Sequence, residues 1–308
     1  MRYDIPILFV VFNRPQIALQ SFQVIKKVKP RKLYLASDAP RETKAGEQEL
    51  VEKTRKFILD SIDWECDVKT LFQEKNLGCG LGVYTAIKWL FDNEECGIIL
   101  EDDCVVDSTF FPYMEEMLLR YATDDRIGMI AGTNPVDNYV PTTSYVFSKY
   151  KSCWGWASWR RAWVNMDLGM KWRDDSYESV LRNAGYCAWD YKGWKYKIKC
   201  IDSNVVSAWD WQWYFSLSAQ NQLCIYPAKN LVSNIGTDVN ATHTSGSNIT
   251  LRSFSLNFPL THPKIVVPDC LFDKLFYENS NTLIIKLKRL IPILLKKQLK
   301  SLITKLKK

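Results

Sequence analysis

The sequence predicts an α/β fold, a mostly parallel sheet flanked by helices. In the first hundred residues, short apolar runs alternate with stretches that favour helices, and polar residues follow each apolar run. This order is typical of parallel strands joined by helical crossovers. The chain has 308 residues, of which 47% are hydrophobic. A chain of this size buries roughly three quarters of its unfolded surface, which suits one large domain or two closely joined halves.

Each element follows from local pattern. A continuous apolar run indicates a strand buried on both faces, and Pro15 suits the first turn of a helix. In chain order we expect a strand at residues 5–12, a helix at 15–28, a strand at 33–37, a helix at 43–62, a strand at 68–72, a glycine-rich segment at 76–82, a helix at 83–91 and a strand at 96–100. Ligands bind at the carboxyl ends of the strands in such sheets.

The second half of the chain has a different composition. Ten of the 12 tryptophans lie between Trp154 and Trp213, and the chain shows no long linker or internal repeat. We therefore expect residues 1–105 and 106–262 to form two halves of one unit, followed by a tail at 263–308.

The nine cysteines form no Cys-x-x-Cys pair, so we expect reduced, mostly buried thiols of a cytosolic protein. The amino-terminal apolar run of about seven residues is too short for a signal peptide or a membrane span. These patterns predict a protein that is not exported.

Three acids follow the strand at residues 96–100, namely Glu101, Asp102 and Asp103. Carboxylates delivered together into one loop repel each other unless a cation neutralises them, and hard oxygen ligands suit Mg²⁺ or Mn²⁺. The alternative is a solvated acidic loop or a pair of charges at a helix start. The position at the end of a core strand favours the metal.

Two further strand ends carry residues suited to an anion. Arg14 follows the first strand with Asn13 beside it, although an arginine in a loop is often simply solvated. The segment that contains Asn76 and Gly78 lies between a strand and a helix, where phosphate-binding loops occur. It matches neither Gly-x-Gly-x-x-Gly nor a Walker A loop, and close backbone packing explains its glycines nearly as well.

Asp210 stands between Trp209 and Trp211. Apolar surroundings raise the pKa of a carboxyl and make it a better general base. The alternative is that Asp210 caps a helix at about 211–220. Most of the neighbouring tryptophans are expected in the core, but one or two could stack on a sugar.

The chain has a net charge of +7, and residues 281–308 hold nine Lys or Arg and no acid, which leaves the rest of the chain close to neutral. Leucine and isoleucine recur there with helical spacing. We expect a basic amphipathic helix, bent at Pro292, that lies on an anionic membrane surface. A partner-binding helix is an alternative. The leucine and isoleucine content argues against nucleic acid.

Taken together, these motifs resemble glycosyltransferases of the GT-A fold, a Rossmann-like fold. Their order is similar to that of the N-acetylglucosaminyltransferase I family and its bacterial relatives. The resemblance covers residues 5–245 and rests on the segments 10–15, 100–103, 110–111, 155–156 and 209–211, together with Asp38.

The resemblance implies an inverting, metal-dependent transfer of a sugar from a nucleotide-sugar donor, expected to be a UDP-sugar, to a saccharide or lipid-linked saccharide. It implies a donor-binding half at 1–105 and an acceptor-binding, catalytic half at 106–262. The roles that it implies are Arg14 at the diphosphate, Asp38 at the base or ribose, Asp102 at the sugar or ribose, Asp103 as the Mn²⁺ or Mg²⁺ ligand, and Asp210 as the base.

The family motif has two adjacent acids where this chain has Asp210 and Trp211, so Asp190 and Asp202 stay open as bases. The resemblance implies a bacterial enzyme of surface polysaccharide synthesis, peripheral on the cytoplasmic face of the plasma membrane. Two other classes stay open. One is a sugar nucleotidyltransferase, although residues 12–15 lack the Gly-rich basic loop it needs. The other is a non-catalytic carbohydrate-binding or membrane-associated protein on the same scaffold.

Overall fold

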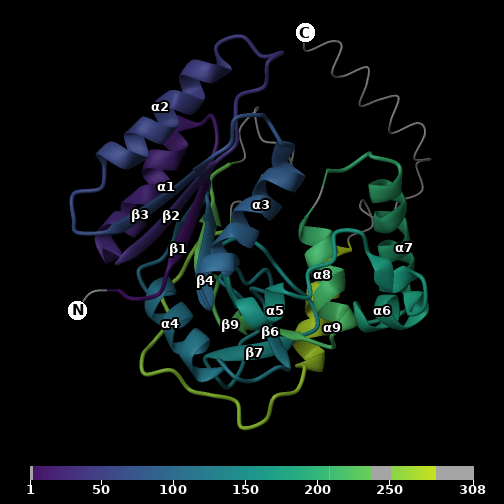
Figure 1. Ribbon diagram of the computed structural model, residues 1–308. Helices are drawn as coiled ribbons and strands as arrows, with labels where there is room; N and C mark the ends of the chain where they lie inside the picture. The colour runs from purple at the N-terminus through teal and green to yellow at the C-terminus, as the bar shows by residue number, and fades with distance from the viewer. Residues whose placement is uncertain (1–2, 208, 237–250, 282–308) are drawn as a thin grey trace.

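A computed structural model describes residues 3–207, 209–236 and 251–281. Its centre is an eight-stranded sheet in the order β3-β2-β1-β4-β8-β6-β9-β7 (Figure 1). The strands are β1 (Ile7–Val11), β2 (Lys32–Ser37), β3 (Asp67–Phe72), β4 (Cys96–Glu101), β6 (Ile127–Ala131), β7 (Tyr145–Ser148), β8 (Trp156–Trp159) and β9 (Leu223–Pro227). The predicted α/β class is confirmed.

The first four strands pair in parallel with one another, with β1 between β2 and β4 and with β3 outside β2. Strand β8 runs antiparallel between β4 and β6, and β7 runs antiparallel to β9 at the far edge. The sheet therefore continues through both sequence halves. The boundaries near residues 105 and 262 stay predictions.

Helices cover both faces of the sheet because alternate strand residues point to opposite sides. In β1, Ile7 and Phe9 pack into one core cluster while Leu8 packs into the other. The first cluster includes residues of α1 (Pro15–Val28) and α4 (Phe110–Arg120), and α2 (Glu47–Asp60) lies against α1. The second includes residues of α3 (Gly78–Asn93), α5 (Arg160–Trp163), α8 (Asp210–Ala219) and α9 (Cys270–Ser280).

A third core cluster joins the small helices beside the sheet (Figure 1). It includes residues of α6 (Tyr177–Asn183), α7 (Ala188–Asp202) and α8. The remaining elements are the 3₁₀ helix η1 (Lys171–Arg173) and a two-stranded antiparallel sheet of β5 (Cys104–Val106) and β10 (Val232–Asn234). That small sheet ties the segment after β4 to a segment about 130 residues later.

Two helix starts differ from the prediction. Helix α2 begins at Glu47 rather than at residue 43, because Gly46 before it has a positive φ of 75°. Helix α3 begins at Gly78, five residues before the predicted start. Gly78 has a φ of 76°, which favours glycine. Most of the predicted glycine-rich loop is thus the first turn of α3.

All nine cysteines are free thiols. Only Cys104, Cys200 and Cys224 are fully buried, so the prediction that most would be buried is wrong. The others lie mainly at element ends, where the core does not enclose them. Within the described ranges, we find no helix both long enough and apolar enough to span a membrane. The predicted tail helix lies outside those ranges, apart from its first residue, Asn281.

Candidate functional site

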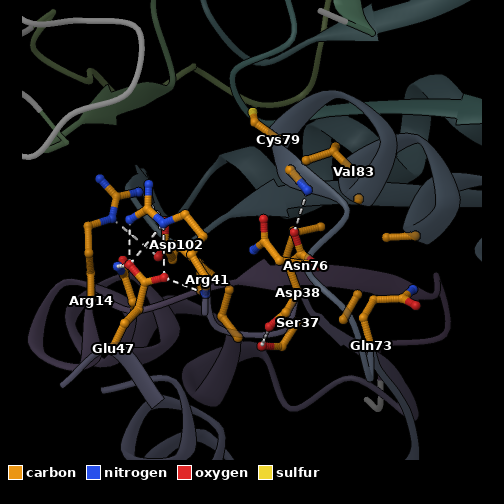
Figure 2. A pocket seen from close by; sticks show the side chains of 18 of the residues that line it. Arg14, Ser37, Asp38, Arg41, Glu47, Gln73, Asn76, Cys79, Val83 and Asp102 are labelled. Carbon is orange, nitrogen blue, oxygen red and sulfur yellow. Dashed lines mark hydrogen bonds and ion pairs between the residues drawn. The ribbon is translucent and has the colours of Figure 1, made fainter. Parts of the chain in front are cut away.

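A cavity of about 590 Å³ opens at the carboxyl ends of β1, β2, β3 and β4 (Figure 2). All four strands are parallel, so the polar residues that follow them gather at one edge of the sheet. Seven of the residues predicted from sequence line this cavity: Asn13, Arg14, Asp38, Asn76, Gly78, Glu101 and Asp102. Asp103 lies just outside, in contact with Arg14.

Arg14 joins the two aspartates that follow β4. Its Nη2 donates to Asp102 Oδ1 and, at 3.0 Å, to Asp103 Oδ2, while its Nε lies 3.4 Å from Asp102 Oδ2. The side chains are 22% exposed for Arg14 and 6% for Asp102. Burial lowers the pKa of Arg14, but Asp102 and Asp103 raise it further, above its usual range. The guanidinium is therefore held as a cation beside the cavity.

Asp103 is held from the far side by the segment around β10. Asn234 Nδ2 donates to Asp103 Oδ1 at 3.2 Å, and Ile235 N donates to the Asp103 carbonyl oxygen at 2.9 Å. A Cβ atom on Gly236 would lie only 2.2 Å from Asp103 Oδ2 and 2.8 Å from Arg14 Nη1. Position 236 therefore needs glycine for the close approach of this segment.

Asp38 holds the start of α3 by its carboxylate. Its oxygens accept hydrogen bonds from the backbone N–H groups of Ala39, Leu77 and Gly78 at 2.8–3.1 Å. Asn76 Nδ2 donates to the Ala39 carbonyl oxygen at 2.6 Å. Asp38 caps a helix from another element. A contact between Asp38 and a base or ribose stays a prediction.

Asn13 and Arg41 meet at a buried carboxylate. Glu47 Oε1 accepts from Asn13 Nδ2 at 2.9 Å, and Glu47 also accepts from the backbone N and the guanidinium of Arg41. Burial raises the pKa of Glu47, but these hydrogen bonds outweigh it and leave the pKa below its usual value. Glu47 thereby connects the loop before α2, through Arg41 (Figure 2), to Asn13 after β1.

Negative charge concentrates between Glu101, Asp102, Asp103 and Asp210. Burial raises the pKa of Glu101 to about 8, with further increases from Asp103, Asp102 and Asp210 that Arg14 only partly offsets. The pKa of Asp102 rises to about 6, through burial against the opposing effect of Arg14. Asp210, the first residue of α8, is thus near enough to Glu101 for their charges to interact.

Asp210 lines a second cavity, of about 330 Å³. The charge of Asp210 raises the pKa of Cys79, which lines the first cavity, and of Cys153, which lines the second; in both thiols burial is the larger cause. Asp210 therefore lies where the two cavities approach each other. The alternative that Asp210 caps a helix is wrong as predicted, because Trp209 is at the N-cap position and Asp210 is the first residue within α8.

The two other candidate bases are placed differently. Asp190 lines the second cavity, where its Oδ2 accepts from the Tyr150 hydroxyl and from Tyr186 N. Asp202 ends α7 in a half-exposed ion pair with Arg173, at 2.9 Å, and lines neither cavity. The geometry therefore brings Asp190, but not Asp202, near Asp210.

The acids fit a divalent ion only if a ligand completes its coordination. No three His, Cys, Asp or Glu side chains in the described part of the chain are grouped to hold an ion by themselves. Mg²⁺ and Mn²⁺, however, are commonly held by one or two carboxylates together with substrate phosphates and water. Asp103 offers hard oxygen atoms beside the cavity, and the local excess of carboxylates favours a cation. The residues therefore fit such an ion, shared with a diphosphate.

Several residues of this site were not predicted from the sequence. Glu47 and Arg41 have no pattern that distinguishes them from other charged residues of an amphipathic segment. Asn234 and Gly236 reach Asp103 only because β10 pairs with β5. The one available signal was the polar segment directly after an apolar pair at 231–232.

Comparisons with known proteins add little to this geometry. No protein-family model matches the chain, and no curated protein does. A mannosyltransferase from Pyrobaculum calidifontis in complex with GDP-Man and Mn²⁺ aligns with 55% of this chain and 47% of its own, at 13% identity and a TM-score of 0.38. HddC from Yersinia pseudotuberculosis aligns with 46% of this chain and 59% of its own, at 10% identity and a TM-score of 0.28.

A UDP-glucose pyrophosphorylase complexed with UDP-glucose covers 47% of this chain and 62% of its own, at 11% identity and a TM-score of 0.26. The chain thus aligns with about half to three fifths of the length of these structures. All three TM-scores are below 0.5, so the structural similarity is too weak to assign an activity. The resemblance to the N-acetylglucosaminyltransferase I family stays a prediction.

Proposed function

We propose that this chain is an inverting, metal-dependent glycosyltransferase that takes a nucleotide-sugar donor, expected to be a UDP-sugar. The observation that supports this most is the pairing of two cavities. The larger one lies at the carboxyl ends of parallel strands beside Arg14, and the smaller one is lined by Asp210. A donor and an acceptor could each occupy one of them, with Asp210 near the junction.

In this proposal the larger cavity binds the donor. A volume of about 590 Å³ lies in the range of small-molecule sites. Arg14 faces the donor diphosphate, and Asp103 with the diphosphate oxygens would hold Mn²⁺ or Mg²⁺. The ion, when bound, supplies Lewis-acid stabilisation of the charge that develops on the leaving group.

The chemical step is a single in-line displacement. The Asp210 carboxylate accepts the proton of an acceptor hydroxyl, and that oxygen forms a bond to the anomeric carbon. The bond from the anomeric carbon to the phosphate oxygen breaks, and the nucleoside diphosphate leaves with the electron pair, stabilised by Arg14. One displacement inverts the anomeric configuration.

Donor hydrolysis tests this proposal without knowledge of the acceptor. Wild type and the isosteric variant Asp103→Asn are incubated with UDP-, dTDP- and GDP-sugars, in Mn²⁺ or in EDTA. We expect one donor to release nucleoside diphosphate, with a loss of about a hundredfold or more in EDTA and in Asp103→Asn. Asp125→Asn, an exposed surface change, is the matched control.

Other products would identify the rival classes. Sugar 1-phosphate and nucleoside triphosphate formed on addition of pyrophosphate would show a nucleotidyltransferase. If no donor is hydrolysed and UDP with Mn²⁺ fails to bind by calorimetry, the non-catalytic reading stands instead.

We also propose that the tail holds the enzyme at the cytoplasmic face of a bacterial plasma membrane, where it contributes to surface polysaccharide synthesis. Nine basic residues in 281–308 would each contribute about 1 kcal/mol near an anionic surface. Sedimentation of the full chain with phosphatidylglycerol vesicles tests this, with phosphatidylcholine vesicles as the control. The triple variant Lys296→Glu, Lys297→Glu, Lys300→Glu should stay in solution. Equal sedimentation of wild type and variant would contradict the proposal.

A further inference from the structure

The second cavity has walls that suit a saccharide. A small cavity with many aromatic side chains and a few polar groups is typical of an organic-ligand site. The aromatic residues that line it are Tyr150, Trp154, Trp194, Trp211, Tyr214 and Phe276. They come from α7, α8, α9 and the segment after β7, so the packing of the small helices against the sheet creates the cavity.

Lys151 is a buried lysine that lines this cavity. The residue is only 8% exposed. Its Nζ donates to Ser218 Oγ at 2.8 Å and lies 4.6 Å from the centre of the Tyr214 ring. No carboxylate of the described residues lies within 4 Å of its Nζ. One neutral hydroxyl and one ring do not replace the hydration of an ammonium group.

Charged groups near Lys151 do not neutralise it. Burial lowers the pKa of Lys151 to about 7, and Cys224 and Asp273 raise it only in part, while Lys149 lowers it further. The Asp273 carboxylate accepts hydrogen bonds from Ser148 Oγ, at 2.5 Å, and from the backbone N–H of Lys149. Lys151 is therefore a buried amine whose charged form has no counter-ion within 4 Å among the described residues.

The indole of Trp194 forms part of the wall of this cavity. Trp194 is 5% exposed, and its Nε1 has no hydrogen-bond partner among the described residues. Lys197 Nζ lies 3.8 Å from the centre of the Trp194 ring. The Asp190 carboxylate is held by Tyr150 and Tyr186. Asn281 Oδ1 in the same wall is also buried without a partner among the described residues. The unpaired polar atoms of this wall thus include one donor and one acceptor, and Lys151 is the feature that favours an anion, whereas Asp210 lies on the side of the first cavity.

We propose that the second cavity binds an acceptor saccharide that carries an anionic group, a carboxylate or a phosphate, and that this group pairs with Lys151. A hydroxyl of the same molecule then faces Asp210. This inference rests on the proposed glycosyltransferase function for the role of the ligand as acceptor. A neutral sugar would leave the Lys151 ammonium without a counter-ion, which is why an anion is favoured.

Ligand-observed NMR on the full chain tests the inference. UDP and Mn²⁺ first saturate the larger cavity, so that anions do not bind beside Arg14. The binding of three sugars is then compared by saturation transfer. Glucuronate carries a carboxylate, glucose 6-phosphate carries a phosphate, and methyl glucoside is neutral, so the comparison shows which anion is bound. We expect one anionic sugar to bind at least about tenfold more tightly than the neutral one, the size of one hydrogen bond to a charged group.

Variants assign the binding to Lys151. Lys151→Met should lose about tenfold in affinity for the anionic sugar, and Lys151→Arg should retain most of it. Lys195→Met is the matched control, because Lys195 pairs with Glu178 and does not line the cavity. If thermal unfolding shows that Lys151→Met is not folded, Lys151→Gln takes its place. Equal binding of neutral and anionic sugars, or no effect at Lys151, would overturn the inference.

Donor hydrolysis separates this inference from the proposed function. Lys151→Met should leave acceptor-independent hydrolysis unchanged within about twofold, because Lys151 does not line the donor cavity. An enzyme that hydrolyses a donor but binds no anion through Lys151 overturns only this inference. Lys151-dependent binding without any donor hydrolysis would establish the anion site and overturn its role for an acceptor.

Discussion

The carboxylate of Asp38, the residue directly after β2, accepts a hydrogen bond of 2.8 Å from the backbone N–H of Gly78, the first residue of α3. The two residues are 40 positions apart, and their contact fixes one wall of the larger cavity. Asp38, which the sequence predicts to contact the donor, thus already binds the backbone at the start of α3.

Removal of this cap should weaken α3. We expect Asp38→Ala to lower the free energy of unfolding by about 1–2 kcal/mol, and Asp38→Asn to lower it less, because asparagine can still accept from a backbone N–H. Urea unfolding measures both. Asp92→Ala, an exposed aspartate near the other end of α3, is the control. Equal stability of Asp38→Ala and wild type would contradict the capping role.

Gly236→Ala should disturb the pairing of Asp103 with Arg14. The new Cβ would lie 2.2 Å from Asp103 Oδ2, so the carboxylate or the segment must move. We expect a loss of stability of about 1–3 kcal/mol and weaker Mn²⁺ dependence of donor hydrolysis. Gly169→Ala, where the nearest atom is 3.4 Å away, is the matched control. If Gly236→Ala keeps wild-type metal dependence, the close approach of Gly236 to Asp103 is not needed for metal binding.

The base can be assigned by comparing three aspartates. We expect Asp210→Asn to lower the kcat of donor hydrolysis by about a hundred- to ten-thousandfold, with little change in the KM for the donor. Asp202→Asn should keep wild-type activity, since Asp202 lies in a half-exposed ion pair. A larger loss in Asp190→Asn than in Asp210→Asn would move the role to Asp190. Retention of anomeric configuration would argue against either as a base.

Asp273 should make stability depend on pH. Burial raises its pKa from 3.8 to about 6, although hydrogen bonds from Ser148 and Lys149 lower it. The folded state therefore binds this proton more tightly than the unfolded state, and the stability that protonation adds below pH 4 is lost as the pH rises to 6. The loss should be about 2–3 kcal/mol.

Asp273→Asn removes this titration. Measured by urea unfolding, its stability relative to wild type should rise between pH 4 and pH 7. If the difference between Asp273→Asn and wild type does not change with pH, Asp273 titrates at its ordinary pKa.

Much of the first half of the fold could be predicted, because its signals are local. Continuous apolar runs specify buried parallel strands, and their carboxyl ends meet at one edge of the sheet. The prediction therefore placed Asn13, Arg14, Asp38 and Asn76 around one cavity. It misplaced the start of α3, because the cap that begins this helix is supplied by Asp38 in another element and not by a neighbour in sequence.

The second half could be predicted less well. Ten tryptophans indicated a large core but not which of them would line a cavity, since an aromatic residue has the same local pattern in either place. No sequence pattern marked Lys151 as buried, because its burial depends on the packing of its own segment, after β7, against Ser218 and Tyr214 of α8.

The sequence by itself determined the α/β class, the strands of the parallel half and the edge where the polar residues gather. Only the tertiary structure decided which charged groups lie together. Arg14 pairs with Asp102 and Asp103, Asp210 is near enough to Glu101 to raise its pKa, and Lys151 has no carboxylate of the described residues within 4 Å. The strands could be predicted because strand propensity and the spacing of apolar residues depend only on residues close in sequence. Charge pairing at this site depends instead on contacts between elements that are about 90 to 130 residues apart, and no local pattern encodes them.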